Sequence, residues 1–374
     1  MIGDRLAAVR ILHVVSGDLW AGAEAQVAAL VAELARDPQL QLHAVVLNPG
    51  ELERRLRAAG AGVTILDESR LSAWHILRGI RAVVRDFRPD VIHTHREKEN
   101  VLGGLAARRA GCASLRTVHG ASEHRPPAWR LDKQAIRGLD RYAERHWQQA
   151  SVAVSDELGL RLRAERPGTA IEVIHNGIDP DALADLRERR RARNAAQRPK
   201  RVAFLGRLVP VKRVDLFLEM ARRCQTAGGG EPTFDVVGEG PLAAELRGLA
   251  DRLGLQARVT FHGFRPDAMA LLADMDALVF TSDHEGTPMA ALEAIAIGVP
   301  VVARAVGGLP ELLTGVAGCR LVEGDDPSAL ASAVLAVLGS HEQPQLPERY
   351  DIRRGAALYR QLYDRAGARV PGRR

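Results

Sequence analysis

Short apolar runs alternate with longer amphipathic segments along most of the chain. Val9–Val15 has the pattern of a buried strand, and apolar residues at helical spacing follow it over 21–35. The same alternation continues downstream. Further strands are predicted at 42–47, 63–66, 91–94 and 115–118, and further helices at 51–59, 72–87, 101–110 and 129–147. Short β-branched runs separated by helices predict βαβ units and a parallel sheet.

The second half of the chain repeats this alternation. Strands are predicted at 202–205, 233–237, 259–262, 277–281 and 299–303, and helices at 214–224, 242–253, 268–275 and 288–296. A length of 374 residues exceeds one ordinary hydrophobic core. We therefore predict an α/β fold of two Rossmann-like parallel-sheet domains, 1–178 and 198–348.

Two segments lie outside these domains. Residues 179–197 are dense in arginine and have almost no apolar periodicity, so we expect a linker with some helix. Residues 349–374 contain an amphipathic stretch at about 352–363, which predicts a final helix followed by a disordered tail. We expect this helix to pack back on the N-terminal domain.

Composition narrows the class of protein. The apolar runs are too short or too interrupted to span a bilayer, and Val9–Val15 does not have the form of a secretory signal. Three widely spaced cysteines, Cys112, Cys224 and Cys319, argue for a reducing cytoplasm. The net charge of +6 follows segment boundaries and aromatic residues make up only 4%. We therefore expect no nucleic-acid partner.

The segment 281–310 holds two glutamates around the start of a helix. Thr287 and Pro288 mark that start, since proline near the first helical position has no amide hydrogen to leave unpaired. The free amides of the first turn suit an anion such as phosphate. Glu285 precedes the turn and Glu293 lies two turns into the helix. A ligand at the helix tip would meet both glutamates through hydroxyls and the amides through phosphates, which suits a nucleotide-sugar.

Two cations follow the strand predicted at 202–205. Gly206-Arg207 comes directly after it and Lys212 five residues later. The carboxyl end of a strand in a parallel sheet faces the ligand crevice. Arg207 and Lys212 are therefore predicted to grip one diphosphate, the first as a fork and the second as a point charge. They would stabilise the charge that grows on a leaving nucleoside diphosphate.

Five segments, in this order and spacing, resemble the large family of group 1 glycosyltransferases, which are retaining enzymes of GT-B fold with a Glu-x7-Glu motif. The segments are SGDLWAGAEAQ (16–26), HTHREKEN with TVHG (93–100 and 117–120), VIHNGID (173–179), FLGRLVPVKRVD (204–215) and the segment with Glu285 and Glu293. The resemblance covers nearly the whole chain. It implies two domains facing across a cleft and a nucleoside-diphosphate sugar as donor substrate.

The resemblance also implies roles for individual residues. His119, Arg207, Lys212 and Glu285 are the expected catalytic residues, with Glu285 and His119 near the donor sugar and Glu293 on the ribose hydroxyls. The family usually has two adjacent glycines where this chain has Ala21-Gly22. The expected donor-binding residues are Gly22, Gly206, Arg207, Lys212, Gly240, Phe264, Arg265, Gly286, Thr287, Met289 and Glu293.

Two clusters raise the question of a metal. His93, His95 and His119 would suit zinc, but no carboxylate or cysteine completes the set at a sensible spacing. Asp274-Met275-Asp276 imitates the Asp-x-Asp of a different glycosyltransferase fold, yet a helix end and strand lead-in explain it. We expect no obligatory metal or cofactor, with Arg207 and Lys212 taking the place of magnesium.

The predicted function is transfer of a sugar from a nucleoside diphosphate to a hydroxyl of a carbohydrate or lipid-linked acceptor, in polysaccharide or glycolipid synthesis. The alternatives are a nucleotide-sugar epimerase of the same fold and a non-catalytic sugar-binding protein. The helix at 129–147 is rich in arginine, with a tryptophan at each end, and would suit an anionic membrane surface. Asp132, Asp140 and Glu144 interrupt its positive face. A cytoplasmic enzyme with peripheral contact to the membrane is the resulting expectation.

Overall fold

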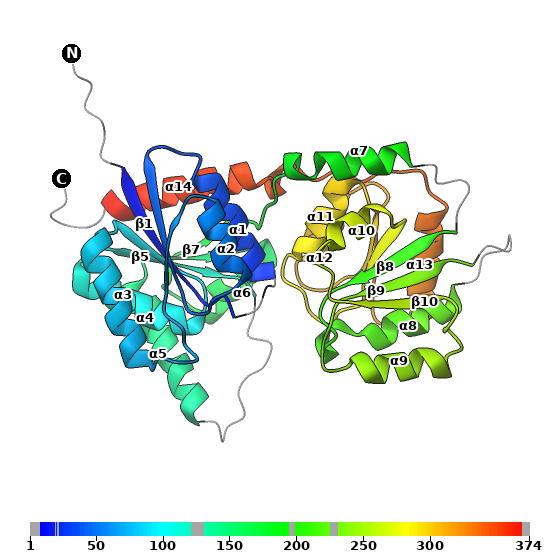
Figure 1. Cartoon of the computed structure of the whole chain (residues 1–374), viewed down its shortest axis with the longest axis horizontal. Coiled ribbons are helices and arrows are strands. Elements are labelled where there is room, and N and C mark those ends of the chain that lie inside the picture. The colour runs from blue at the N-terminus through cyan, green and yellow to red at the C-terminus, as the bar shows by residue number, and fades with distance from the viewer. Residues whose placement is uncertain are drawn as a thin grey trace, which may run out of the picture. The chain divides into compact units, whose positions relative to one another are not determined.

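The chain divides into two compact units in a computed structural model (Figure 1). Unit 1 comprises residues 1–177 together with 352–374, and unit 2 comprises 178–351. The structure describes residues 8–18, 20, 22–120, 131–193, 199–224 and 231–368. Each unit is built around its own parallel sheet, which confirms the predicted pair of Rossmann-like domains.

Unit 1 contains a seven-stranded sheet in the order β3-β2-β1-β4-β5-β6-β7, with every neighbouring pair parallel. The strands are β1 Val9–Val15, β2 Leu40–Val46, β3 Gly62–Ile65, β4 Val91–Thr94, β5 Ala113–Val118, β6 Ala150–Ala153 and β7 Ile171–Val173. The helices are α1 Gly22–Leu34, α2 Glu51–Ala58, α3 Ala73–Phe87, α4 Glu97–Ala110, α5 Leu131–Trp147, α6 Asp156–Glu165 and α14 Ile352–Ala368.

Helices cover both faces of this sheet, which is why its central strands are apolar on both sides. Leu12 and Val14 of β1 pack with α3 and α4, whereas Ile11 packs on the opposite face with α1 and α14. The helix boundaries follow local signals. Ser155 caps α6 by accepting a hydrogen bond from the backbone N–H of Leu158 at 3.2 Å.

The last helix, α14, completes the core of unit 1. Ile352, Tyr359 and Tyr363 are buried in the same cluster as Ile11 and Leu115 of the sheet. The expected packing of the C-terminal helix on the N-terminal domain is therefore confirmed. The helix continues to Ala368, five residues beyond the predicted end.

Unit 2 contains a six-stranded parallel sheet in the order β10-β9-β8-β11-β12-β13. The strands are β8 Arg201–Leu205, β9 Thr233–Val237, β10 Val259–Gly263, β11 Ala277–Phe280, β12 Val301–Arg304 and β13 Arg320–Val322. The α-helices are α7 Ala184–Ala192, α8 Val214–Arg223, α9 Ala243–Arg252, α10 Ala268–Ala273, α11 Met289–Ile297, α12 Leu309–Leu313 and α13 Pro327–Leu338. Short 3₁₀ helices lie at Asp181–Leu183 (η1), Pro210–Lys212 (η3) and Glu348–Tyr350 (η4).

The segment expected as a linker contains α7, which is tied to unit 2. Arg190 donates hydrogen bonds to the carbonyl oxygens of Gly298 (Nε, 2.8 Å) and Met275. Arg189 pairs with the carboxylate of Asp274 at 2.7 Å. Arginine side chains that reach backbone carbonyls thus hold in place a helix with no fully buried residue.

Most predicted elements of the two sheets are present within a few residues. Those not anticipated are β6, α6 and β7 in unit 1 and α12, β13 and α13 in unit 2. The three strands among them are three or four residues long, so each gives little periodic signal. Helix α4 begins at Glu97, four residues before the predicted start. The prediction missed this first turn because it is polar and gives no apolar periodicity.

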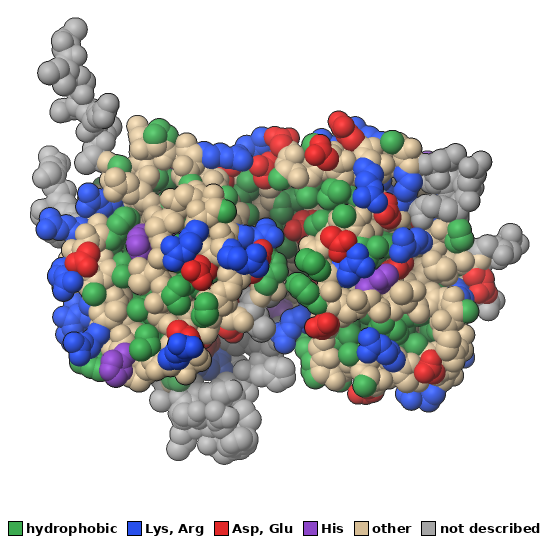
Figure 2. Space-filling view, viewed as in Figure 1, with side chains coloured by type: hydrophobic (Ala, Val, Ile, Leu, Met, Phe, Trp, Pro, Cys, Tyr) green, Lys and Arg blue, Asp and Glu red, His purple; other side chains and the backbone are tan. Residues whose placement is uncertain are grey.

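The surface carries mixed charge. On the face shown in Figure 2, lysine and arginine side chains are interspersed with aspartate and glutamate over both units. Within the described parts of the chain, no helix combines the length and the apolar character needed to cross a bilayer.

Candidate active site

The loops that follow β8 and β11 meet at the point where the strand order of unit 2 reverses. β8 pairs with β9 on one side and β11 on the other, and successive connections leave in opposite directions. The hydroxyl of Thr281 donates to the carbonyl oxygen of Lys212 at 3.0 Å. The backbone N–H of Asp283 donates to the carbonyl of Val211 at 2.8 Å. These bonds join the two loops into one surface at the carboxyl edge of the sheet.

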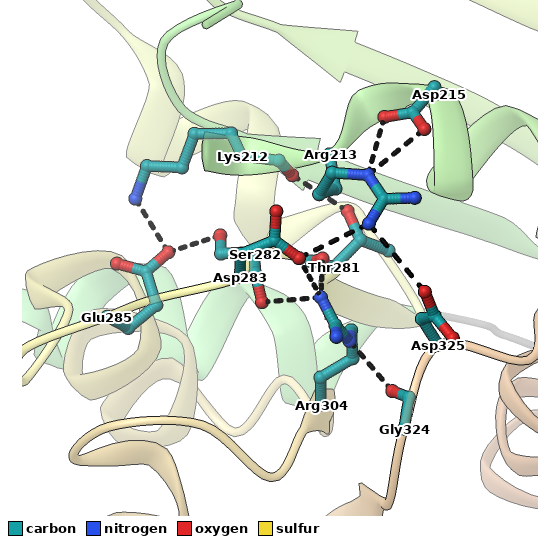
Figure 3. Close-up of polar contacts among 10 residues, drawn as sticks. All are labelled: Lys212, Arg213, Asp215, Thr281, Ser282, Asp283, Glu285, Arg304, Gly324 and Asp325. Atoms are coloured by element: carbon teal, nitrogen blue, oxygen red, sulfur yellow. Dashed lines mark hydrogen bonds and ion pairs between the residues drawn. The ribbon is translucent and has the colours of Figure 1, made fainter. Parts of the chain in front are cut away.

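Lys212 and Glu285 form an ion pair on this surface. The Lys212 ammonium lies 2.6 Å from Oε1 of Glu285, and the Ser282 hydroxyl donates to the same oxygen at 2.6 Å (Figure 3). The Lys212 side chain is 24% exposed and that of Glu285 only 7%. The structure thus brings together two of the predicted catalytic residues, and the lysine holds the glutamate instead of a phosphate.

Two arginines, Arg304 and Arg213, hold the loop that follows β11 through hydrogen bonds and ion pairs. Arg304, at the end of β12, donates through Nη1 to the carbonyls of Thr281 (3.2 Å) and Ser282 (3.1 Å) and to the carboxylate of Asp283 (2.6 Å). Arg213 has a left-handed backbone with φ 48° and ψ 49°, uncommon for a residue with a side chain. Its guanidinium reaches Asp283 at 3.2 Å (Figure 3). The position of the loop that carries Glu285 therefore depends on charged side chains that the sequence alone did not single out.

A glycine turn after β12 packs against the same loop. Gly307 has φ 55°, and a Cβ there would lie 1.7 Å from the carbonyl oxygen of Glu285. The N–H of Gly308 donates to that oxygen at 3.2 Å. Helix α11 begins at Met289 with Pro288 as its N-cap, one residue after the predicted start. Backbone contact between the two turns fixes the path from Glu285 into this helix.

The other predicted donor-binding residues of unit 2 lie around these loops. A Cβ on Gly240 would lie 2.3 Å from the carbonyl oxygen of Leu208, so the turn after β9 touches the loop after β8. The guanidinium of Arg207 is exposed and has no hydrogen bond or ion pair with any described residue. Phe264 is 61% exposed, and Arg265 pairs with Asp267 at 2.7 Å. Arg207 is thus available for a ligand anion, as far as the described residues show.

Thr287 and Met289 are buried, whereas Gly286 and Glu293 are half-buried. Glu293 is therefore not the freely solvated carboxylate of a surface helix, although Glu285 is the more enclosed of the pair. Gly206 is held by a hydrogen bond from its N–H to the carbonyl of Val237 at 3.0 Å.

Unit 1 has a small pocket at its own reversal of strand order, between β1 and β4. It is lined by Val15, Ser16, Ala23, Glu24, Val27, Leu52, His95, Arg96 and His119. Arg96 pairs with the carboxylates of Glu24 at 2.5 Å and Asp18 at 3.1 Å. Gly22 opens α1 beside this pocket, and His119 follows β5. The two predicted site residues of unit 1 therefore belong to one end of its sheet.

His119 is the end of a chain of buried histidines. Its Nε2 lies 3.1 Å from Nδ1 of His95, whose Nε2 lies 3.2 Å from Nδ1 of His13. Burial lowers the pKa of His13 to about 4, and burial together with the charge of Arg96 lowers the pKa of His119 to about 3. Burial first, and neighbouring imidazoles second, also place the pKa of His95 and of His93 well below the usual value. These rings are neutral at pH 7.

The chain matches two family models, which together span most of it. One, described as glycosyl transferases group 1, matches residues 199–340, and the other, glycosyltransferase family 4, matches 20–182. The 2-deoxystreptamine N-acetyl-D-glucosaminyltransferase of Streptomyces fradiae is 31% identical over 302 residues, 75% of this chain and 69% of that protein. The chain belongs to the group 1 glycosyltransferases.

A second sequence relative and a solved structure are also similar to this group 1 glycosyltransferase. The D-inositol 3-phosphate glycosyltransferase of Mycolicibacterium paratuberculosis is 32% identical over 67% of this chain, which spans 58% of that relative. HepE of Anabaena, solved in complex with UDP, superposes with a TM-score of 0.75 at 19% identity. That alignment covers 96% of this chain and 100% of HepE.

The aspartates that imitate a metal motif in this glycosyltransferase have other partners. Asp274 pairs with Arg189 at 2.7 Å, and Asp276 pairs with Arg193 at 2.9 Å. Asp276 also accepts the backbone N–H of Arg201 at 2.8 Å. Asp274 therefore links the end of α10 to α7, and Asp276 links β8 to the residue that follows α7.

Sequence reasoning missed Arg304, Arg213 and His13. His13 left a signal, because it is a polar residue in an otherwise apolar strand, and parallel pairing sets it opposite His93. Arg304 lies at the carboxyl end of a buried strand, as Arg207 does. The rule that the carboxyl ends of parallel strands face the ligand crevice could therefore have identified Arg304 too. For Arg213, only the observed left-handed backbone marks the position.

We expect Arg304→Met to loosen the loop that carries Glu285. Three carbonyls and a carboxylate would lose their donor, and a buried acceptor without a partner costs about 1–3 kcal/mol. The free energy of unfolding of unit 2 should fall by that order in urea titrations followed by circular dichroism. Amide exchange at residues 281–285 should rise at the same time.

Arg320→Met is the matched control, since Arg320 lies on the neighbouring strand β13 with its side chain 47% exposed, against 12% for Arg304. Equal amide exchange at 281–285 in both variants would contradict the supporting role of Arg304.

The buried histidines predict acid sensitivity of unit 1. When the folded-state pKa of a histidine lies below its unfolded value of 6.5, the unfolded chain binds a proton first as the pH falls. The free energy of unfolding is therefore fully retained above pH 6.5 and decreases as the pH falls toward the folded-state pKa, about 4 for His13. The free energy of unfolding should decrease by about 1.4 kcal/mol per pH unit for each proton bound only by the unfolded chain. His13→Asn should reduce this slope.

Tryptophan fluorescence isolates this effect, because all four tryptophans, at positions 20, 74, 129 and 147, lie in unit 1. Urea titrations at pH 7 and pH 5 give the slope. Identical slopes for the native protein and His13→Asn would show that His13 takes up no proton on unfolding.

Proposed function

We propose that this protein is a retaining glycosyltransferase that moves a sugar from a nucleoside diphosphate to a hydroxyl of an acceptor. The observation that carries the proposal is the Lys212–Glu285 pair at the strand reversal of unit 2, beside the exposed Arg207 and the start of α11. Cations, a carboxylate and the N-terminal end of a helix at one strand edge suit a diphosphate joined to a polyol.

Binding of the donor would exchange partners within this pair. The Lys212 ammonium would leave Glu285 for the diphosphate, and Arg207 would join it without breaking an existing contact. Glu285, still held by the hydroxyl of Ser282, would then accept hydrogen bonds from sugar hydroxyls. Glu293 would accept those of the ribose. The ion pair in the free protein thus holds both side chains in place until the ligand arrives.

The chemistry then requires stabilisation of the leaving group. As the glycosidic bond breaks, negative charge grows on the diphosphate, where Arg207 and Lys212 would oppose it. The family's reaction is pictured as displacement on the front face, with the leaving phosphate taking the acceptor proton. A site with two cations on the leaving group suits that scheme, because the leaving phosphate takes the acceptor proton and no separate base is needed.

The donor and acceptor are proposed from the relatives. HepE was solved with UDP and with UDP-glucose, so a uridine nucleotide is the first donor to test. The names of two relatives give 2-deoxystreptamine and D-inositol 3-phosphate, both hydroxylated six-membered carbocycles. Unit 1 would hold the acceptor, where Arg96 and Glu24 supply both signs of charge to the pocket. Lipid-linked and polysaccharide acceptors form the other class of acceptor to include in the transfer assay.

We also propose peripheral contact with an anionic membrane through α5. Its Ile136, Leu139 and Tyr142 are each about half exposed. Asp140 and Glu144, which interrupt the positive charge in the sequence, are buried and face Arg116 at 3.0 and 3.6 Å. The outer surface of the helix is therefore more basic than its sequence suggests, and apolar side chains lie beside that charge.

Lys212→Ala should lower turnover about a hundredfold, on the scale of removing one preorganised charge stabiliser. The assay follows release of UDP from UDP-glucose with each acceptor, and a parallel incubation with donor alone detects epimerisation. Lys200→Ala is the control, because Lys200 precedes β8 at the opposite end of that strand. An unaltered rate in Lys212→Ala would show that Lys212 does not stabilise the diphosphate. An isomerised sugar nucleotide without acceptor would favour the epimerase.

Membrane contact predicts co-sedimentation with vesicles that contain phosphatidylglycerol and weaker binding to pure phosphatidylcholine. Replacing Ile136, Leu139 and Tyr142 together by serine should reduce the bound fraction at least about tenfold, since each of these side chains would bury apolar area in the lipid on binding. Leu160→Ser, an exposed apolar position on α6, serves as control. Equal binding by the triple variant would place the contact elsewhere.

A further inference from the structure

Three imidazoles connect the pocket of unit 1 to the interior of its sheet. His13 lies on β1, His95 directly follows β4, and His119 directly follows β5, three neighbouring strands. The contacts run in one line: His13 Nδ1 to His95 Nε2 at 3.2 Å, then His95 Nδ1 to His119 Nε2 at 3.1 Å. We call these residues the histidine relay.

The two outer nitrogen atoms of the relay differ in what surrounds them. His13 Nε2 is buried and has no hydrogen-bond partner among the residues that the structure describes, and the same holds for His119 Nδ1. His119 lines the pocket, however, whereas His13 is fully enclosed by the protein core. Since Nε2 of His119 is engaged by His95, a ligand in the pocket would meet His119 through Nδ1.

Neutral imidazole carries one proton, and this couples the three rings. Each contact needs one N–H and one lone pair, so a ring that accepts on one side must donate on the other. Only two arrangements satisfy both contacts: all three rings protonated at Nδ1, or all three protonated at Nε2. The tautomer of His119 is therefore tied to that of His13.

The buried end decides between the two arrangements. Protonation at Nε2 throughout would leave an N–H of His13 without an acceptor in the core, which no ligand reaches. Protonation at Nδ1 throughout leaves a lone pair on His13 and moves the unpaired N–H to His119, which lines the pocket and could donate to a substrate there. Orphaned buried N–H groups are the rarer of the two in proteins. The arrangement with Nδ1 protonated in every ring is thus favoured, and it makes His119 Nδ1 a donor.

We propose that His13 and His95 are positioning residues that fix His119 as a neutral Nδ1–H donor toward an oxygen of the bound substrate. The proposal rests on the proposed function, in which the pocket that His119 lines holds a substrate. A neutral donor orients a hydroxyl or ring oxygen without adding positive charge beside Arg96. It also means that His119 offers no lone pair to the pocket and does not act there as a base.

His93 stands apart from this relay. Its Nδ1 lies 2.8 Å from the hydroxyl of Tyr363, and its Nε2 lies 2.8 Å from that of Thr117. Nitrogen atoms of His13, His93 and His95 nevertheless lie within 4.8 Å of one another, close enough for a metal ion. A bound metal would take the lone pairs that the relay uses, so the metal content of the purified protein belongs to the test.

The test is the imidazole nitrogen spectrum of the whole protein labelled with ¹⁵N-histidine at neutral pH, with signals assigned from single substitutions. Two-bond nitrogen–proton correlations distinguish the two tautomers. We expect His13, His95 and His119 all to be protonated at Nδ1. Protonation of His119 at Nε2, different tautomers within the three rings, or one equivalent of bound metal would each overturn the proposal.

His95→Leu and His95→Asn form a matched pair of similar size. Leucine removes the donor to His119, whereas the asparagine amide places an N–H near the position of His95 Nδ1. In His95→Leu the single tautomer of His119 should be lost and kcat should fall about tenfold with little change in KM, while His95→Asn should restore most of both. Retention of the Nδ1–H tautomer in His95→Leu would show that the relay does not set it.

The spectrum separates this proposal from the proposed function. If native protein transfers no sugar but shows the three Nδ1–H rings, the function is wrong and the relay stands. If it transfers sugar with His119 protonated at Nε2, the relay is wrong and the function stands.

Discussion

The strand order shared by the two sheets is the constraint on which both candidate sites depend. In each unit the first strand is central and the chain proceeds outward on one side before returning to the other, so the connections after β1 and β4, and after β8 and β11, diverge. Backbone amides and carbonyls at these strand ends lack ladder partners. Side chains from the diverging loops supply them, and the same side chains form the sites.

The two units meet this requirement with different chemistry. Unit 2 uses full charges: Arg304 and Arg213 hold the loop of Asp283, and Lys212 holds Glu285. Unit 1 combines the Arg96–Glu24 ion pair with imidazole rings whose pKa values are lowered by burial. A diphosphate carries several negative charges, whereas a sugar or cyclitol carries mainly hydroxyls. Each arrangement therefore suits the ligand proposed for its unit.

Sequence reasoning predicted what depends on local pattern. Val9–Val15 and Val91–Thr94 have the predicted bounds, because each is an apolar run that ends at polar or breaking residues. Strand-end rules also placed Lys212 and Glu285 at one edge. Their direct contact could not be predicted, since it depends on β8 lying beside β11, two strands about seventy residues apart in the chain. The same limit concealed the pairing of His13 with His93 across β1 and β4.

The packing of α14 has a consequence for synthesis on the ribosome. Unit 2 is one continuous stretch, 178–351, whereas the core of unit 1 lacks Tyr359 and Tyr363 until the segment after it has been translated. The first unit to begin emerging is thus the last to finish folding. During that interval the apolar surface around Ile11 and Leu115 is open, and a nascent chain in this state is the form that chaperones would recognise.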